Sequence, residues 1–247
     1  MPVVFCDVDG VLRRQKGVPI SSEIRQAVTS FNEDLGIFYM ITGAPLEHVP
    51  DLPAWRIFAE AGGVYVRKQD HIFEPGREAV LELRRRLEIF QEDGVVETSW
   101  GSVIVEGPKR FTSLTLLFGR PPHYPGAVTS ADMEEVNAWI GEFARELSLT
   151  LSVGHDTTYS YSDIFSVTKR QTVAAVMEEE RLLHAYFLGD KHPDLEAMLV
   201  PGIIPVGFSN SIKDIQVLAQ RKGVYIDLPG PEGGVVEFFR LLKEGKI

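Results

Sequence analysis

Two carboxylates stand two residues apart immediately after the first apolar segment of the sequence. Residues 3–6 are uniformly apolar, which is typical of a strand buried on both faces of a parallel sheet, and Asp7 and Asp9 follow them. In an extended chain, residues i and i+2 point to the same side, so both carboxylates can face one crevice. Gly10 permits a sharp turn directly after them. The alternative is an Asx turn that merely ends a strand.

Polar residues also end two later apolar segments. Thr42 and Gly43 follow residues 37–41, and Asp190, with Asp194 behind it, follows the apolar segment that starts at residue 185. Catalytic groups of α/β sheets gather at the carboxyl ends of the strands. The three strand ends therefore predict one site that combines carboxylates with a hydroxyl group.

The predicted pattern of helices and strands changes along the rest of the chain. A helix over residues 22–35 between the first two apolar segments predicts a right-handed βαβ unit. The middle of the chain predicts hairpins and amphipathic helices, and the alternation of strands and helices resumes near Lys169. We expect an α/β fold: a three-layer, doubly wound parallel-sheet core formed by residues 1–63 and 167–247, with an inserted α+β cap domain over residues 64–166.

Composition narrows the class of protein. The 247 residues carry a formal net charge of −10, with 44% hydrophobic and 24% charged residues, as in ordinary globular proteins. The negative charge argues against nucleic acid as a partner. The apolar run before Asp7 is too short for a membrane helix or signal peptide, and the single cysteine, Cys6, suits a reducing compartment, so we expect a cytoplasmic protein without membrane contact. The sequence does not indicate an oligomeric state.

Four segments resemble, in order, the motifs of the haloacid-dehalogenase-like superfamily of aspartate-dependent phosphatases. They are Asp7-Val8-Asp9-Gly10-Val11, Ile41-Thr42-Gly43, Lys169, and Gly189-Asp190 through Asp194 and Met198. The insert between the second and third motifs is similar to the type II cap of the Cof-like branch, which includes sucrose-phosphate and mannosyl-3-phosphoglycerate phosphatases. Two departures from the family pattern are Val11, where Thr is usual, and Pro193, where Asn is usual.

The resemblance implies a Mg²⁺-dependent phosphatase that hydrolyses a small phosphorylated metabolite through an aspartyl-phosphate intermediate. Sugar phosphates are the leading candidates for this metabolite. It implies Asp7 as the nucleophile, Asp9 as the general acid and base, and Thr42 and Lys169 as the groups that neutralise the phosphate. The implied substrate-binding residues are Thr42, Gly43, Lys169 and Asn210. The implied metal ligands are Asp7, Asp9 through its backbone carbonyl, and Asp190, with Asp194 either a further ligand or a residue that orients the ligands.

Other interpretations stay open. A phosphomannomutase-like phosphomutase shares the nucleophile and the sequence Gly189-Asp190-Lys191, and a non-catalytic phospho-ligand-binding protein would explain Val11 and Pro193. A few charged residues of the insert could contact substrate, but solvated strand faces and hairpin tips explain them more simply. These residues are Lys109, Arg110, His155, Asp156 and Asp163.

Overall fold

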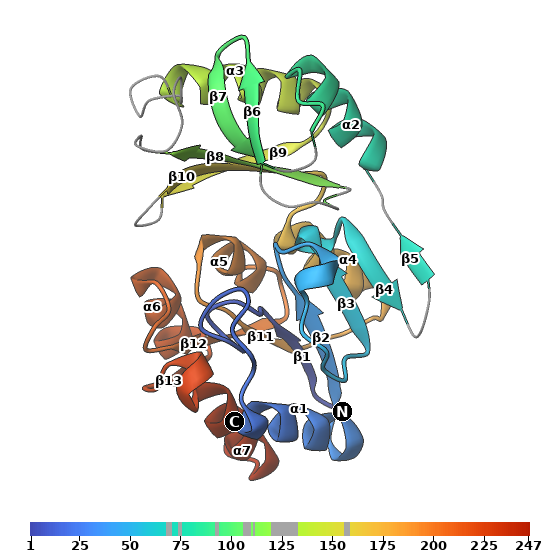
Figure 1. The fold of residues 1–247 in the computed structure, drawn as a ribbon. Helices are drawn as coiled ribbons and strands as arrows, with labels where there is room; N and C mark the ends of the chain where they lie inside the picture. The colour runs from blue at the N-terminus through green and yellow to red at the C-terminus, as the bar shows by residue number, and fades with distance from the viewer. Residues whose placement is uncertain are drawn as a thin grey trace. The chain divides into compact units, whose positions relative to one another are not determined.

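The computed structural model describes residues 1–67, 71–73, 76–91, 94–105, 110, 112–119, 133–155 and 159–247. The chain divides into two compact units (Figure 1). The core unit comprises Met1–Ile72 and Thr168–Ile247, and the inserted unit comprises Phe73–Val167. Lys109 and Asp156 lie outside the described residues.

An eight-stranded sheet forms the centre of the core unit, in the order β13-β12-β11-β1-β2-β3-β4-β5. Its strands are β1 (Val3–Cys6), β2 (Ile37–Ile41), β3 (Arg56–Ala59), β4 (Val64–Arg67), β5 (His71–Phe73), β11 (Ala185–Leu188), β12 (Ile203–Phe208) and β13 (Val224–Ile226). The pairs from β13 through β3 are parallel. Strand β1 lies between β2 and β11, so the chain leaves it toward one side of the sheet and returns on the other. Such a switch point places a crevice at the carboxyl end of β1.

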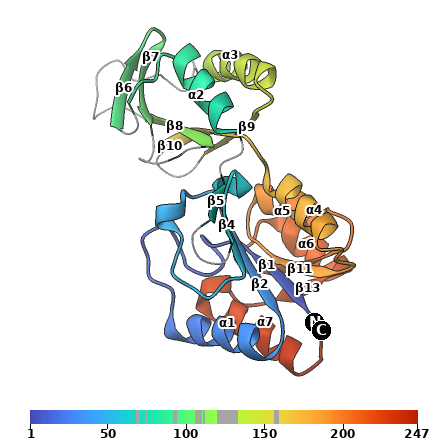
Figure 2. The same cartoon turned by 90° about the vertical axis from the view of Figure 1, so that its right-hand side faces the viewer.

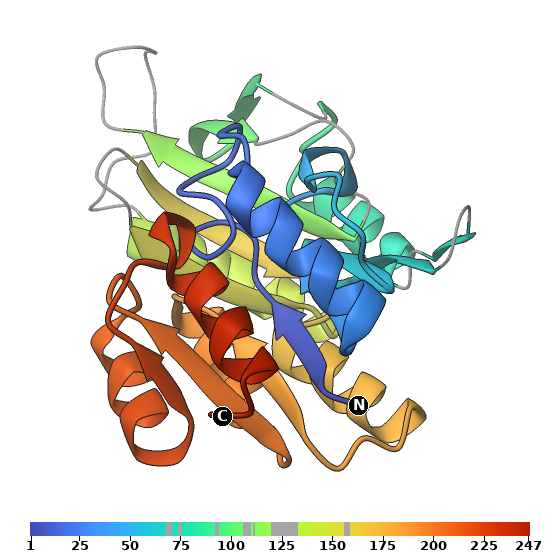
Figure 3. The same cartoon turned by 90° about the horizontal axis from the view of Figure 1, so that it is seen from below.

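Helices cover both faces of this sheet (Figures 2 and 3). On one face lie α1 (Ser22–Asp34) and α7 (Gly234–Lys243), which are side by side in Figure 3. On the other lie α4 (Lys169–Glu179), α5 (His192–Met198) and α6 (Lys213–Lys222). The connections include the 3₁₀ helices η1 (Leu46–His48), η2 (Glu60–Gly62) and η3 (Gly230–Glu232).

The alternation of β1 explains why both faces are covered. Val4 and Cys6 pack in the apolar cluster of α1 and α7, whereas Val3 and Phe5 pack in the cluster of α4, α5 and α6. A strand with apolar residues on both sides is stable only when both sides are buried. The sheet and its two helical layers confirm the predicted α/β fold.

The inserted unit is an antiparallel sheet with helices on one face. Its strands, in spatial order, are β6 (Gly94–Thr98), β7 (Gly101–Val105), β8 (Ser113–Gly119), β10 (Tyr159–Phe165) and β9 (Thr150–His155). Helices α2 (Arg77–Arg86) and α3 (Met133–Glu146) pack on it through one apolar cluster with no described member in the core unit. Asp163 accepts a 2.6 Å hydrogen bond from Thr115, its partner on the neighbouring strand.

The insert begins later than the sequence predicts. The sequence pattern assigns residues 64–67 to the cap, but β4 pairs antiparallel with β3 and β5 continues the same sheet. The compact inserted unit starts at Phe73. None of the helices in the described part of the chain has the length and hydrophobicity that crossing a bilayer requires.

Candidate active site

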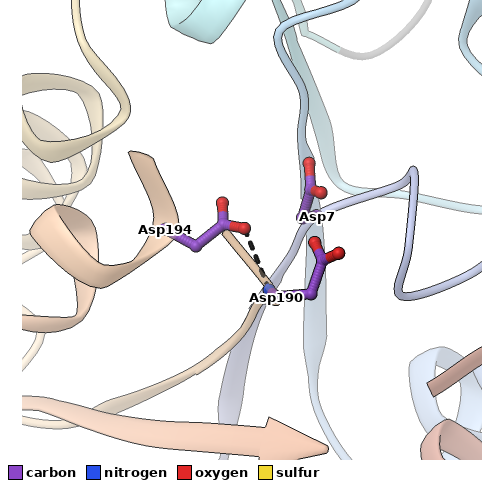
Figure 4. A group of neighbouring side chains, drawn as sticks. All are labelled: Asp7, Asp190 and Asp194. Carbon is purple, nitrogen blue, oxygen red and sulfur yellow. Dashed lines mark hydrogen bonds between the residues drawn. The ribbon is translucent and has the colours of Figure 1, made fainter. Parts of the chain in front are cut away.

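Three buried carboxylates meet at the carboxyl ends of β1 and β11. One oxygen of each of Asp7, Asp190 and Asp194 lies within 4.8 Å of the others (Figure 4). The backbone N–H of Asp7 donates to the carbonyl of Leu188 at 2.9 Å, which continues the pairing of the two strands. The sheet therefore brings together residues that are more than half the chain apart.

Lys169 provides the positive charge of this cluster. Its Nζ donates to Asp7 Oδ1 at 2.6 Å and to Asp194 Oδ1 at 2.7 Å, and the residue is only 6% exposed. Lys169 is the first residue of α4, whose start is fixed by a capping box between Thr168 and Gln171. Burial lowers the pKa of Lys169, but Asp194 and Asp7 raise it above its ordinary value. The side chain is therefore a permanent cation.

Asp194 fixes the loop that follows β11. Its Oδ2 accepts the backbone N–H groups of Asp190 at 3.0 Å and Lys191 at 3.1 Å (Figure 4 draws the first), and its Oδ1 accepts from Lys169. Both oxygens thus have partners within the protein. Pro193 lies in the first turn of α5, where a missing N–H leaves no helical bond unmade. This explains why a proline is tolerated in the segment.

Asp190 is the least satisfied member of the cluster. Its Oδ1 is buried and has no hydrogen-bond partner among the residues that the structure describes. Burial, and then the charges of Asp7 and Asp194, raise the pKa of Asp190 to about 8. Gly10, with φ of +91°, passes so close that a Cβ there would overlap the Asp190 carboxylate. The backbone therefore approaches this carboxylate as only glycine allows.

Asp7 has a partner but is also buried. Burial raises its pKa to about 6, the attraction of Lys169 opposes this shift, and Asp194 adds to it. Three carboxylates face one ammonium group, so the cluster carries an excess of negative charge once all of them ionise. A divalent cation would offset that charge, and an all-oxygen donor set suits a hard cation such as Mg²⁺.

Asp9 stands apart from the cluster and pairs with a residue that the sequence analysis missed. Arg13 Nε donates to Asp9 Oδ1 at 2.6 Å, and Arg13 Nη2 donates to the carbonyl of His48 at 3.0 Å. The Arg13 side chain is buried, and that of Asp9 is partly exposed. No sequence pattern signals this pair, because it depends on the turn that follows Gly10.

The predicted phosphate-binding residues lie on neighbouring loops of the core unit. Thr42 follows β2 and is buried, and its hydroxyl oxygen accepts the backbone N–H of Ala44 at 3.1 Å, which holds the turn at Gly43. Asn210 donates to the Gly10 carbonyl at 2.7 Å and accepts a hydrogen bond from the backbone N–H of Gly230 at 2.8 Å. It therefore clamps the loop that carries Asp9, and contact of its side chain with substrate stays a prediction.

Comparison with solved structures identifies the fold. A phosphatase of the haloalkanoate (HAD) enzyme superfamily from Bacteroides thetaiotaomicron superposes with a TM-score of 0.66 at 15% identity, covering 100% of this chain and 96% of that chain. The protein has the fold of the haloacid-dehalogenase-like hydrolases. A sugar phosphatase of HAD subclass IIB gives 0.62 at 14% identity, with all of both chains covered. A trehalose-6-phosphate phosphatase related protein gives 0.62 at 14% identity, covering 99% of this chain and 100% of that chain.

Sequence comparison alone does not reach this haloacid-dehalogenase-like fold. No protein-family model matches the sequence, and no curated protein matches it. At identities near 15%, shared structure persists where overall sequence similarity has faded. The likeness concerns the fold, and the chemistry must be argued from the side chains of this chain.

Proposed function

We propose that this protein is a Mg²⁺-dependent phosphatase that hydrolyses a small phosphorylated metabolite through an aspartyl-phosphate at Asp7. Sugar phosphates are the leading candidates for the substrate. One observation carries the proposal. Asp7, at the end of the central strand β1, accepts a hydrogen bond from the buried Lys169. Beside it lies Asp190, whose Oδ1 has no hydrogen-bond partner among the described residues. The similar folds include a sugar phosphatase of HAD subclass IIB and a trehalose-6-phosphate phosphatase related protein, which supports the substrate class.

The residues divide the work of phosphoryl transfer. An Asp7 oxygen attacks phosphorus, the bond to the leaving oxygen breaks, and Asp9 gives that oxygen its proton. In the second half, Asp9 takes a proton from the water that attacks the aspartyl-phosphate, which releases phosphate and restores both residues. Lys169 and the Thr42 hydroxyl donate to the phosphate oxygens.

The carboxylate cluster fits a metal ion. Asp7, the lone oxygen of Asp190 and the backbone carbonyl of Asp9 would hold Mg²⁺, and Asp194, whose oxygens are engaged, would orient Asp190 and Lys169. A bound cation would neutralise charge on the phosphate oxygens.

A screen of phosphorylated metabolites tests the proposal. The purified protein is incubated with each compound in the presence of Mg²⁺ or EDTA, and released phosphate is measured. We expect release only with the metal, and none from Asp7→Asn. A phosphomutase would instead return an isomeric sugar phosphate without releasing phosphate, and a binding protein would shift its melting temperature with ligand but turn nothing over.

We also propose that the protein acts in the cytoplasm. Its single cysteine, Cys6, is buried in β1 and burial raises the pKa of its thiol, so the fold does not depend on an oxidising compartment. Cell fractionation with an antibody against the protein tests this assignment.

A further inference from the structure

A guanidinium group bridges the Asp9 carboxylate to a second loop. Arg13 Nε lies 2.6 Å from Asp9 Oδ1, and Nη2 lies 3.4 Å from Oδ2. The same Nη2 donates to the carbonyl of His48 at 3.0 Å. The carboxylate is therefore attached to η1, in the loop that follows β2 and Thr42.

The backbone places Arg13 where this bridge can form. Gly10 N–H donates to the Arg13 carbonyl at 2.7 Å, and Arg13 N–H donates to the carbonyl of Val8 at 3.1 Å. Val11 and Leu12, inside this turn, are buried in the apolar cluster beneath the sheet. These backbone hydrogen bonds hold the Cα of Arg13 in place relative to Asp9.

The two oxygens of Asp9 differ in what they can do. Oδ1 is held firmly by Nε, whereas the 3.4 Å contact of Oδ2 is at the long limit of a hydrogen bond. Oδ2 is therefore the more weakly held of the two oxygens. Arginine suits this task better than lysine, because its planar fork can hold a carboxylate and a carbonyl at once.

We infer that Arg13 is a positioning residue, which orients the Asp9 carboxylate so that Oδ2 meets the leaving oxygen of the substrate. The inference rests on the proposed phosphatase function. The proton passes from Asp9 to the leaving oxygen as the phosphorus–oxygen bond breaks, and Arg13 exchanges no proton. A misplacement of about 1 Å in such a group can lower the rate on the order of 10²-fold.

Leaving groups of different basicity test this role. An aryl phosphate needs little proton donation, whereas an alkyl phosphate needs much. For Arg13→Ala we expect a loss in kcat of about 10- to 100-fold with the best alkyl phosphate of the screen and less than about threefold with the aryl ester. Arg13→Lys should fall between, because an ammonium group keeps the charge but cannot hold Asp9 and His48 together.

Arg14→Ala is the matched control. Arg14 is the next residue, is largely exposed and pairs at 2.9 Å with Glu232. Its removal should leave both rates within about twofold of the wild type, as is usual for exposed pairs that contribute little. Thermal denaturation of each variant shows whether the core remains folded.

A double-mutant cycle with Asp9→Asn shows whether Arg13 acts through Asp9. If it does, Arg13→Ala costs nothing further with the alkyl ester once Asp9 can no longer transfer a proton. Equal losses for the two esters, or additive losses in the double variant, would overturn the inference while leaving the phosphatase proposal intact. If the wild type and Arg14→Ala release no phosphate from any ester, the phosphatase proposal fails and the inference with it.

Discussion

Lys169 lies where a lysine side chain is expected to destabilise the fold. It is buried and is the first residue of α4, where the helix dipole disfavours a cation. The carboxylates of Asp7 and Asp194 compensate for this placement. Lys169 is therefore a member of a buried ion-pair cluster and not a solvated lysine of a first helical turn. In the proposed mechanism, this ammonium group also donates to the phosphate oxygens of the substrate.

The two carboxylates after β1 should respond differently to the same substitution. Asp7→Asn removes the nucleophile, so phosphoenzyme should not form, and turnover should fall on the order of 10³-fold or more with every ester. Asp9→Asn keeps the nucleophile, so it should lose about 10²- to 10⁴-fold with alkyl phosphates but less with aryl phosphates. Rapid-quench measurement of phosphoenzyme separates the two. Phosphorylation of Asp7→Asn would contradict the assignment.

The metal-free protein should become less stable as the pH rises from the ordinary carboxyl pKa of about 3.9 toward 8. The raised pKa of Asp190, about 8, means that the folded chain keeps a proton that the unfolded chain has already released. Each increase in pH in this window therefore favours unfolding. Mg²⁺ binds the ionised carboxylate, so its affinity should increase over the same window.

Asp190→Asn cannot ionise and should flatten this pH dependence. Its melting temperature without metal should exceed that of the wild type at pH 8 by a few degrees, at about 2–4 °C for each kcal/mol in a chain of this size. The exposed Asp34→Asn serves as control. Scanning calorimetry in EDTA across the pH range measures the effect. Parallel curves for the two variants would contradict the role given to burial of Asp190.

At the scale of elements, the turn after β1 depends on Gly10 for two separable reasons. Its φ of +91° is strained for other residues, and a Cβ would overlap the Asp190 carboxylate. Gly17, with φ of +81° and open space where a Cβ would stand, has only the first constraint. The two glycines therefore form a matched pair within one loop.

Both alanine variants should lose about 1–2 kcal/mol of stability from the positive φ. Only Gly10→Ala should also weaken Mg²⁺ binding, by about 10- to 100-fold, because it displaces Asp190. Titration calorimetry and thermal denaturation measure the two effects separately. Equal metal affinities in the two variants would show that Gly10 serves the backbone alone.

Local sequence patterns predicted the helices and strands better than they predicted which segments these contact. The apolar run of β1 and the helical spacing of α1 depend on neighbours in sequence, so the sequence predicts them correctly. The sequence pattern places residues 64–67 in the insert, whereas β4 pairs with β3, because a hairpin pattern does not say which sheet a strand joins. The Arg13 contact with Asp9 depends on the shape of the turn after Gly10, which residue spacing alone does not reveal. The unpaired Oδ1 of Asp190 depends on how distant segments meet, which no local pattern encodes.

At the scale of the whole molecule, each unit has its own apolar core. The clusters of the core unit contain no residue of Phe73–Val167, and all the carboxylates proposed for catalysis belong to the core unit. Replacing Phe73–Val167 by a short Gly-Ser linker should therefore leave a folded protein that hydrolyses aryl phosphates weakly. It should lose discrimination among metabolites, which we assign to the insert. An unchanged ranking of natural substrates would contradict that assignment, and Asp7→Asn in the shortened chain is the control.

The central place of β1 has a consequence for how the protein is made. On the ribosome, β1 and β2 emerge early, but the other neighbour of β1 begins only at Ala185. At about 5–20 residues per second, β1 waits on the order of 10 s with one edge unpaired. The contiguous inserted unit is completed within that interval and can fold first. Among stalled nascent chains, those that end before β12 should therefore already contain a protease-resistant insert, and only those that end after β12 should also contain a resistant core. Chaperones should bind the shorter chains at the unpaired edge of β1.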